Sequence, residues 1–119
     1  MIGRLSGRHE FARLRADGAR VGRGPVQIIS RYDEARTPPT TRIAFAIPRS
    51  VGSAVVRNRI RRRIRAMIHD LDRDPATRPM PGDHLIRVSA PIDAWPATQL
   101  RQTMMTLLPA SPSSPAARS

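Results

Sequence analysis

Six arginines lie close together in the middle of the chain, and their side chains suit the binding of phosphate. They are Arg57, Arg59, Arg61, Arg62, Arg63 and Arg65. A guanidinium group pairs with two phosphate oxygens at once and keeps its charge when it is partly buried. Asn58 lies among them and has two possible roles: hydrogen bonding to a phosphate or sugar, or hydrogen bonding within its own helix. The segment therefore predicts contact with a polyanion such as RNA.

An amphipathic helix must position these arginines. Apolar residues recur through the segment at helical spacing: Val56, Ile60, Ile64, Met67, Ile68 and Leu71. At about 100° per residue they form one stripe, with arginine on both of its flanks. Ser53 is the expected N-cap, because its hydroxyl can accept a hydrogen bond from the first turn. We expect the helix to fray after about Leu71, because the carboxylates that follow oppose the helix dipole.

Those carboxylates leave two interpretations open. Asp70, Asp72 and Asp74 alternate along the chain. They could gather a hydrated cation, or they could belong to an ordinary polar loop. The Asp74-Pro75 step should end the helix, because the residue before a proline is driven out of the helical conformation.

The charge of the whole chain also favours an anionic partner. Among 119 residues there are 21 basic and 9 acidic side chains, a net charge of +12, and every basic residue is arginine. Between Ala35 and His69 there are nine arginines and no acid. Such asymmetry indicates nucleic acid or an anionic surface rather than a small-molecule pocket. A membrane surface is the alternative for a basic amphipathic helix, although this one lacks aromatic anchors. The absence of lysine is typical of a GC-rich genome.

Several other classes of site are missing from the sequence. There is no cysteine, which excludes disulfides and thiolate zinc sites. The three histidines are scattered, and no Ser-His-Asp set, paired glutamates or nucleotide-binding loop is evident. We expect no catalytic residue and no metal site in the protein. No apolar run approaches the roughly 20 residues that span a bilayer, and the N-terminus lacks the apolar region of a signal peptide. The expected location is cytoplasmic, with no membrane partner and no obligate protein partner evident.

The remaining elements predict one small α+β domain over residues 1–108. In order they are a helix from Ser6 to Gly18, a flexible basic connection at 19–24, a strand from Pro25 to Tyr32, a loop at 33–40, a strand from Thr41 to Ile47, the arginine helix, a proline-rich loop at 75–82, a strand from His84 to Ser89 and a helix from Ile92 or Pro96 to Leu108. Small alanines on one face of the second strand leave room for a packed helix. Residues 109–119 are expected to be disordered. The order α-β-β-α-β-α implies a sandwich.

The run from Gly52 through Arg57-Asn58-Arg59 to Arg65 resembles the signature of the bacterial ribonuclease P protein subunit. That family carries an Arg-Asn-Arg core after a Gly-x-Ala-Val element, and an acidic-Phe pair in its first helix, here Glu10-Phe11. The resemblance extends over about residues 4–108. It implies the family's fold, which is also that of one domain of a small-subunit ribosomal protein, with a left-handed β-α-β crossover around the basic helix.

The resemblance also implies a function. The family's protein is the small subunit of a ribonucleoprotein endonuclease that removes the 5′ leader of precursor tRNA. The implied partners are therefore ribonuclease P RNA and precursor tRNA. The RNA subunit carries the chemistry with bound Mg²⁺, and the protein binds no cofactor of its own. A general RNA-binding or ribosome-associated module without a catalytic RNA partner is the alternative.

Site residues are carried over by position. Those expected to contact the catalytic RNA are Arg49, Arg57, Asn58, Arg59, Arg61, Arg62, Arg63 and Arg65. Those expected to contact the leader, in a cleft between the first helix and the sheet, are Phe11, Arg15, Val26 and Ile29. The last three stand where the family often has aromatic residues, so the guanidinium of Arg15 would have to replace a stacking ring.

Overall fold

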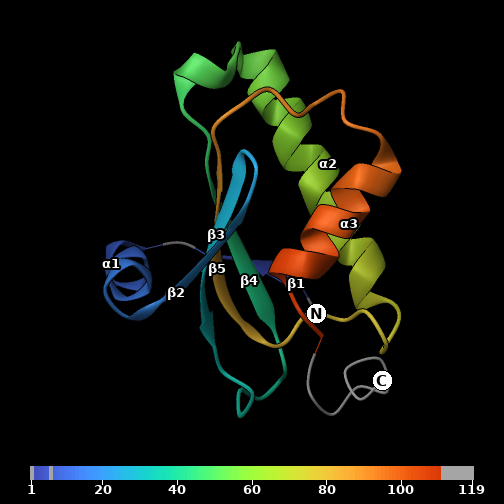
Figure 1. Ribbon diagram of the computed structural model, residues 1–119. Helices are drawn as coiled ribbons and strands as arrows, with labels where there is room; N and C mark the ends of the chain where they lie inside the picture. Colours follow the sequence, from blue (N-terminus) through green and yellow to red (C-terminus); the bar gives the residue numbers. More distant parts are fainter. Residues whose placement is uncertain (1, 6, 111–119) are drawn as a thin grey trace.

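The computed structural model describes residues 2–5 and 7–110, which form a mixed sheet with helices on both faces (Figure 1). The elements are β1 (Ile2–Arg4), α1 (Arg8–Asp17), β2 (Ala19–Arg23), β3 (Val26–Tyr32), β4 (Thr41–Ala46), the 3₁₀ turn η1 (Arg49–Val51), α2 (Ala54–Asp72), β5 (Gly82–Val88) and α3 (Ala97–Leu107). The predicted α+β class and the predicted order of the main elements are confirmed.

The sheet has five strands in the order β1-β4-β5-β3-β2. β1 and β5 run parallel to β4, whereas β3 is antiparallel to both β5 and β2. Parallel strands need a long crossover connection, and α2 supplies it between β4 and β5. The arginine helix therefore lies on the sheet because the chain must cross from one parallel strand to its neighbour.

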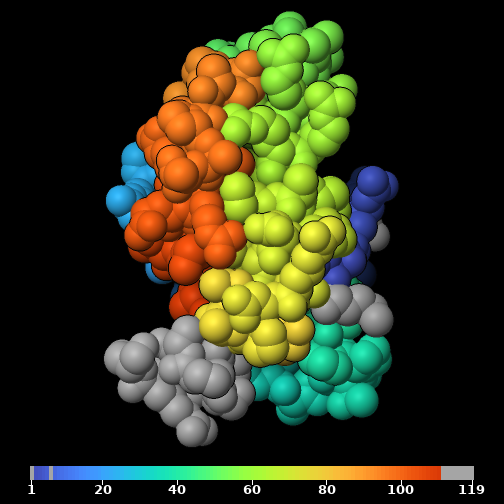
Figure 2. All heavy atoms as spheres, turned by 90° about the vertical axis from the view of Figure 1, so that its right-hand side faces the viewer, coloured from blue at the N-terminus to red at the C-terminus, as the bar shows by residue number. Residues whose placement is uncertain are grey.

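Two apolar layers separate the helices from the sheet. On one face, α2 and α3 pack side by side (Figure 2) and bury Val26 and Ile28 of β3 beneath them. On the other face, α1 places Leu14 against Ile29, Ala44 and Leu85. Successive strand residues point to opposite faces, so β3 serves both layers. The small side chain of Ala44 lies under α1, as the sequence predicted.

Two strands were not predicted from the sequence. β2 replaces the expected flexible connection at 19–24, and β1 precedes the first helix. All five residues of β2 are exposed, so no apolar alternation marks it. It forms because its backbone pairs with β3 across the tight Gly24-Pro25 turn. β1 has three residues and is held by parallel pairing with Thr41–Ile43.

Several predicted boundaries also moved. β5 begins two residues before the predicted His84, because Gly82 and Asp83 pair with both β3 and β4. A Cβ at Gly82 would lie 2.5 Å from the carbonyl oxygen of Arg31, so only glycine fits there. α1 starts at Arg8 and ends before Gly18. The predicted cap Ser6 lies outside the described residues.

The chain after α3 does not leave the fold at residue 109. The Pro109 carbonyl accepts a hydrogen bond from the Met80 amide, and Ala110 forms a β-bridge with Pro79. The first two residues of the predicted disordered tail, Pro109 and Ala110, are therefore part of the fold. The rest of that predicted tail, 111–119, lies outside the described residues. Across residues 2–5 and 7–110, no helix is long and apolar enough to cross a membrane.

Candidate nucleic-acid interface

α2 begins and packs as its sequence predicts. The Ser53 hydroxyl accepts a hydrogen bond from the Val56 amide at 3.3 Å. The predicted stripe faces the sheet: Ile60, Ile64, Ile68 and Leu71 are buried, and Val56 and Met67 are partly buried against the same core. The helix ends at Asp72. Because its apolar face is fully used by the core, the arginines of α2 must point sideways and outward.

On one flank of α2, three arginine side chains each make a separate contact within the protein. Arg61 donates to the Asn58 side-chain oxygen at 2.8 Å, so Asn58 hydrogen bonds within its own helix. Its side-chain nitrogen has no acceptor in the part of the chain that the structure describes, so it can donate to a ligand. The Nε of Arg57 donates to the Gly52 carbonyl at 3.2 Å, and the guanidinium of Arg65 lies over the Phe45 ring, 5.4 Å from its centroid. These contacts fix the side chains while leaving guanidinium N–H groups for an anion.

The other flank of α2 is tied to the segment between β5 and α3. Arg59 pairs with the Asp93 carboxylate at 3.2 Å, and Arg63 donates to the Asp93 backbone carbonyl at 2.7 Å. Sequence reasoning found no acid to pair with these arginines along the helix, because Asp93 is 30 or more positions away. The two flanks of α2 therefore differ: Asp93 neutralises part of one, and no carboxylate among residues 2–5 and 7–110 contacts the other.

The guanidinium groups of two further arginines have no partner among the described residues. Arg62 lies on the outer surface of α2, and Arg49 lies in η1 just before the helix; both are exposed. An exposed guanidinium without a carboxylate partner is the group that a phosphate binds most easily. The structure thus places all eight residues predicted for the catalytic RNA on or directly before one helix.

The three aspartates after the arginines have separate structural partners. Asp70 pairs with Arg101 of α3 at 3.0 Å, Asp72 lies 3.7 Å from Arg78, and the Asp74 side chain accepts a hydrogen bond from the Ala76 amide. Within the described ranges, no group of three or more acidic or histidine side chains is arranged to hold a metal ion. The polar-loop interpretation accounts for these contacts.

Of the residues predicted to contact the leader, two are buried in the core, one on each face of the sheet, so burial contradicts their prediction. Val26 is 0% exposed and Ile29 is 1% exposed; Val26 packs under α2 and α3, and Ile29 packs under α1. Neither has surface that RNA could reach. Phe11 is partly buried against the α1 core, and Arg15 is exposed.

A cavity of about 640 Å³ lies at the end of the sheet where β3 starts and β5 ends. Its lining includes candidate RNA-binding residues that sequence reasoning missed. Gln27, Ala46 and Arg87 come from three neighbouring strands and share the sheet face that α1 covers elsewhere. Gln27 also accepts a hydrogen bond from Arg87 at 3.4 Å. The signal in the sequence was the polar residue between Val26 and Ile28, which strand alternation places on the opposite face.

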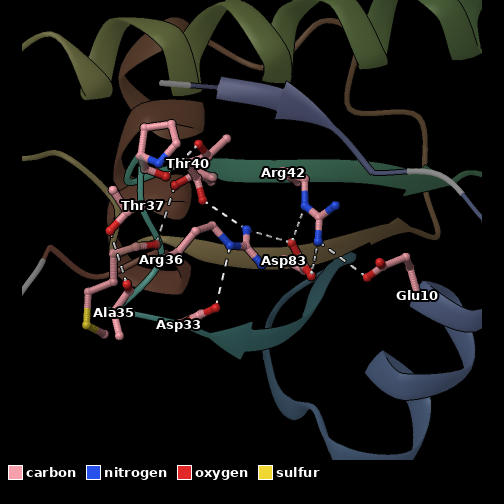
Figure 3. Close-up of polar contacts among 11 residues, drawn as sticks. Glu10, Asp33, Ala35, Arg36, Thr37, Thr40, Arg42 and Asp83 are labelled. Atoms are coloured by element: carbon pink, nitrogen blue, oxygen red, sulfur yellow. Dashed lines mark hydrogen bonds and ion pairs between the residues drawn. The ribbon is translucent and has the colours of Figure 1, made fainter.

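A buried carboxylate, Asp83 of β5, organises the opposite end of the same sheet face (Figure 3). Its oxygens accept hydrogen bonds from Arg36 at 2.9 Å and from Arg42 at 2.8 and 2.9 Å. Arg42 also reaches Glu10 of α1 at 3.4 Å, and Arg36 reaches Asp33 at 3.6 Å. Burial alone would raise the pKa of Asp83, but the hydrogen bonds and charges of the two arginines outweigh it and lower the pKa. The network joins α1, β4, β5 and the 33–40 loop.

Comparison with known proteins places this arrangement in one family. The family model described as Ribonuclease P matches residues 3–110. The ribonuclease P protein component of Micrococcus luteus is 36% identical over 78 residues, which cover 60% of this chain and 59% of that protein. The corresponding protein of Streptomyces avermitilis is 36% identical over 74 residues, covering 56% of this chain and 59% of the relative. The chain thus matches less than two thirds of the length of these curated relatives.

Solved structures share the fold at lower identity. The RNase P protein of Staphylococcus aureus superposes with a TM-score of 0.70 at 18% identity, covering 88% of this chain and 91% of the other. That of Thermotoga maritima gives a TM-score of 0.71 at 18% identity, covering 88% and 94%. At this identity the likeness establishes the fold.

Proposed function

Since the chain belongs to the ribonuclease P protein family, we propose that it is the protein subunit of ribonuclease P. In this role it binds the catalytic RNA and the 5′ leader of precursor tRNA and promotes endonucleolytic removal of the leader. The RNA subunit carries the chemistry, using Mg²⁺, and this chain contributes no catalytic side chain. Its own residues bind and orient RNA.

The observation that carries the proposal is the arginine surface of α2. Burial of Ile60, Ile64 and Ile68 fixes the orientation of the helix, so the arginines on its flanks keep a fixed arrangement. Arg62 and the flank of Arg57 and Arg61 contact no carboxylate among the described residues. Like charges this close repel one another, and a polyphosphate backbone relieves that repulsion. The surface therefore suits the backbone of a folded RNA.

For the leader, we propose the α1 side of the sheet. Phe11 and Arg15 of α1 remain the candidates from the sequence, and Gln27 and Arg87 of the adjoining cavity replace the buried Val26 and Ile29. Glutamine and arginine offer hydrogen bonds to base edges and phosphates. Single-stranded RNA would thus be held chiefly by polar contacts, because Phe11 is the one aromatic residue of this set.

The charge of the chain also bears on the Mg²⁺ demand of the holoenzyme. Precursor tRNA and the catalytic RNA are both polyanions, and their approach requires counterions. A subunit with a net charge of +12 supplies positive charge at that contact. The protein should therefore lower the Mg²⁺ concentration at which the RNA subunit cleaves.

The direct experiment is cleavage of precursor tRNA at low Mg²⁺ by the cognate catalytic RNA, with and without the full-length protein. We expect cleavage at the mature 5′ end to be restored by the protein and weakened by Arg57→Ala. The matched control is Arg101→Ala, which removes the same charge from α3, where it forms an exposed pair with Asp70. If the protein binds both RNAs without changing the rate or the Mg²⁺ requirement, the proposal fails and a general RNA-binding role replaces it.

A further inference from the structure

We propose that the cavity between α3 and the β2–β3 turn is a subsite for one unstacked nucleobase of bound RNA. The proposal rests on the RNA-binding function proposed above and adds a second kind of contact to it. The arginines of α2 bind backbone phosphate, whereas this subsite would bind a base. It lies against α3, on the face that α2 and α3 share, and adjoins the cavity on the α1 side at Gly24 and Pro25, which line both.

The cavity has the size and lining that a base requires. Its volume is about 350 Å³, which is at the small end of the range for ligand pockets, about 300–1,000 Å³. Trp95 forms part of its wall, together with Arg23 at the β2–β3 turn and Gln99 and Gln102 of α3. Flat aromatic and guanidinium groups stack on bases, and side-chain amides read base edges with paired donors and acceptors.

The polar groups of the cavity remain available for a ligand. The side-chain amides of Gln99 and Gln102 have no hydrogen-bond partner among the described residues, and both residues are exposed. They lie three positions apart in α3, so they project from the same side of the helix. Arg23 is held in place by a hydrogen bond to Thr106 of α3 at 3.1 Å. This contact keeps the turn against the helix and the cavity formed.

Trp95 is the only tryptophan of the chain, and its position links the cavity to the arginine helix. Its indole packs in part against the core under α3, and its backbone amide donates to the Ile92 carbonyl at 3.1 Å. Within that short turn lies Asp93, which contacts Arg59 and Arg63 of α2. The turn from Ile92 to Trp95 therefore contacts this flank of α2 through Asp93 and lines the cavity through Trp95.

The single tryptophan provides the test, since Trp95 lines this cavity and does not line the cavity on the α1 side. The full-length protein is titrated with a short single-stranded RNA and with the same RNA carrying abasic sugars. Labelled-RNA anisotropy is measured in parallel to report overall binding. We expect quenching of Trp95 by the base-bearing RNA and little by the abasic RNA. Base stacking is worth about 1–3 kcal/mol, so the abasic RNA should bind roughly tenfold more weakly.

Variants separate a base contact from an indirect change. Gln99→Ala and Gln102→Ala should each weaken binding of the base-bearing RNA severalfold and leave abasic RNA unaffected. Thr98→Ala is the matched control, because Thr98 is an exposed neighbour on α3 that does not line the cavity. Repeating the titration with catalytic RNA alone and with precursor tRNA alone shows which of them provides the base.

Failure of the subsite is distinguishable from failure of the proposed function. The subsite is overturned if RNA binding is seen by anisotropy but both RNAs quench Trp95 equally. It is also overturned if the glutamine variants have no effect on binding. Either result leaves the proposed α2 interface unaffected. RNA that does not bind at all overturns both.

Discussion

At the scale of single residues, the charged groups of this protein have two distinct environments. Arg62 and Arg49 lie exposed without a carboxylate partner among the described residues, whereas Arg36 and Arg42 are fixed by the buried Asp83. The first pair is available to RNA, and the second pair is part of the fold. Residue type alone does not separate them, since all four are arginines; burial and partner do.

Replacing Asp83 by asparagine should destabilise the fold. The change removes the buried charge shared by Arg36 and Arg42, with side chains 20% and 33% exposed, and leaves each arginine only its longer carboxylate contact, to Asp33 or Glu10. We expect a loss of about 2 kcal/mol in the free energy of unfolding. Urea unfolding measures it. The control is Asp33→Asn, because Asp33 is half-exposed and 3.6 Å from Arg36, and such a pair is worth about 0–1 kcal/mol. Equal effects of both variants would contradict a structural role for Asp83.

His84 should make the stability depend on pH. Burial lowers its pKa from 6.5 to about 4, against smaller opposing effects of the Asp83 charge and the Met80 carbonyl, and its Nδ1 lies 2.7 Å from the Ser30 hydroxyl. At a pH between the unfolded pKa of 6.5 and the folded pKa of about 4, His84 is protonated in the unfolded chain and neutral in the folded protein. The free energy of unfolding therefore falls as the pH falls from about 6.5 to about 4. The full loss is roughly 3 kcal/mol.

The test compares unfolding free energies of the parent protein and His84→Gln across that pH range. We expect the difference between the two proteins to shrink as the pH decreases. A constant difference would show that His84 is not the group responsible. Asp83, whose pKa is lowered, loses its contribution only as the pH falls through that lowered value, which is below the range of the test.

At the scale of elements, α1 is held closely against the sheet at its C-terminus. A Cβ at Gly18 would lie 2.4 Å from the Leu14 carbonyl oxygen and 2.6 Å from the Ile29 Cγ2 atom. Its φ of −74° is open to any residue, so close packing alone selects glycine here. This contact sets how near α1 lies to β3.

Gly18→Ala should therefore cost stability through overpacking, by about 1–3 kcal/mol, as measured by urea unfolding. Gly22→Ala in β2 is the matched control, because the nearest atom to a Cβ there is 3.6 Å away. We also expect Gly18→Ala to weaken binding of a leader RNA more than binding of the catalytic RNA, since α1 and α2 lie on opposite faces of the sheet. If the two variants unfold with equal free energies, α1 can move to make room for the added methyl group without losing stability, and the prediction is wrong.

At the scale of the whole molecule, the charge surplus should make RNA binding strongly dependent on salt. Each phosphate neutralised contributes about 0.7–0.9 to the slope of log affinity against log salt. We expect Arg57→Ala with Arg59→Ala to flatten the slope for the catalytic RNA, and Asp93→Asn to steepen it by freeing Arg59 from its carboxylate partner. Filter binding across a salt series measures both. An unchanged slope for the double variant would mean that Arg57 and Arg59 do not contact phosphate. The control is Arg101→Ala, which should leave the salt slope of the parent protein unaltered.

The sequence by itself determined the features that depend on local periodicity and charge. The stripe from Val56 to Leu71, the Ser53 cap, the stop at Gly18 and the alternation of β3 each follow from neighbouring residues, because helix and strand periods repeat within a few positions. The concentration of arginine on α2 is likewise a property of composition. The handedness of the β4–α2–β5 crossover stays a prediction.

Tertiary structure decided what depends on partners distant in the chain. β2 and β1 exist through backbone pairing and carry no apolar signal. Val26 and Ile29 are buried because helices cover both faces of β3, a fact that no single strand reveals. Asp93 meets Arg59 and Arg63 across 30 or more positions. Packing of separate elements, rather than local preference, therefore fixed which predicted contact residues RNA can reach.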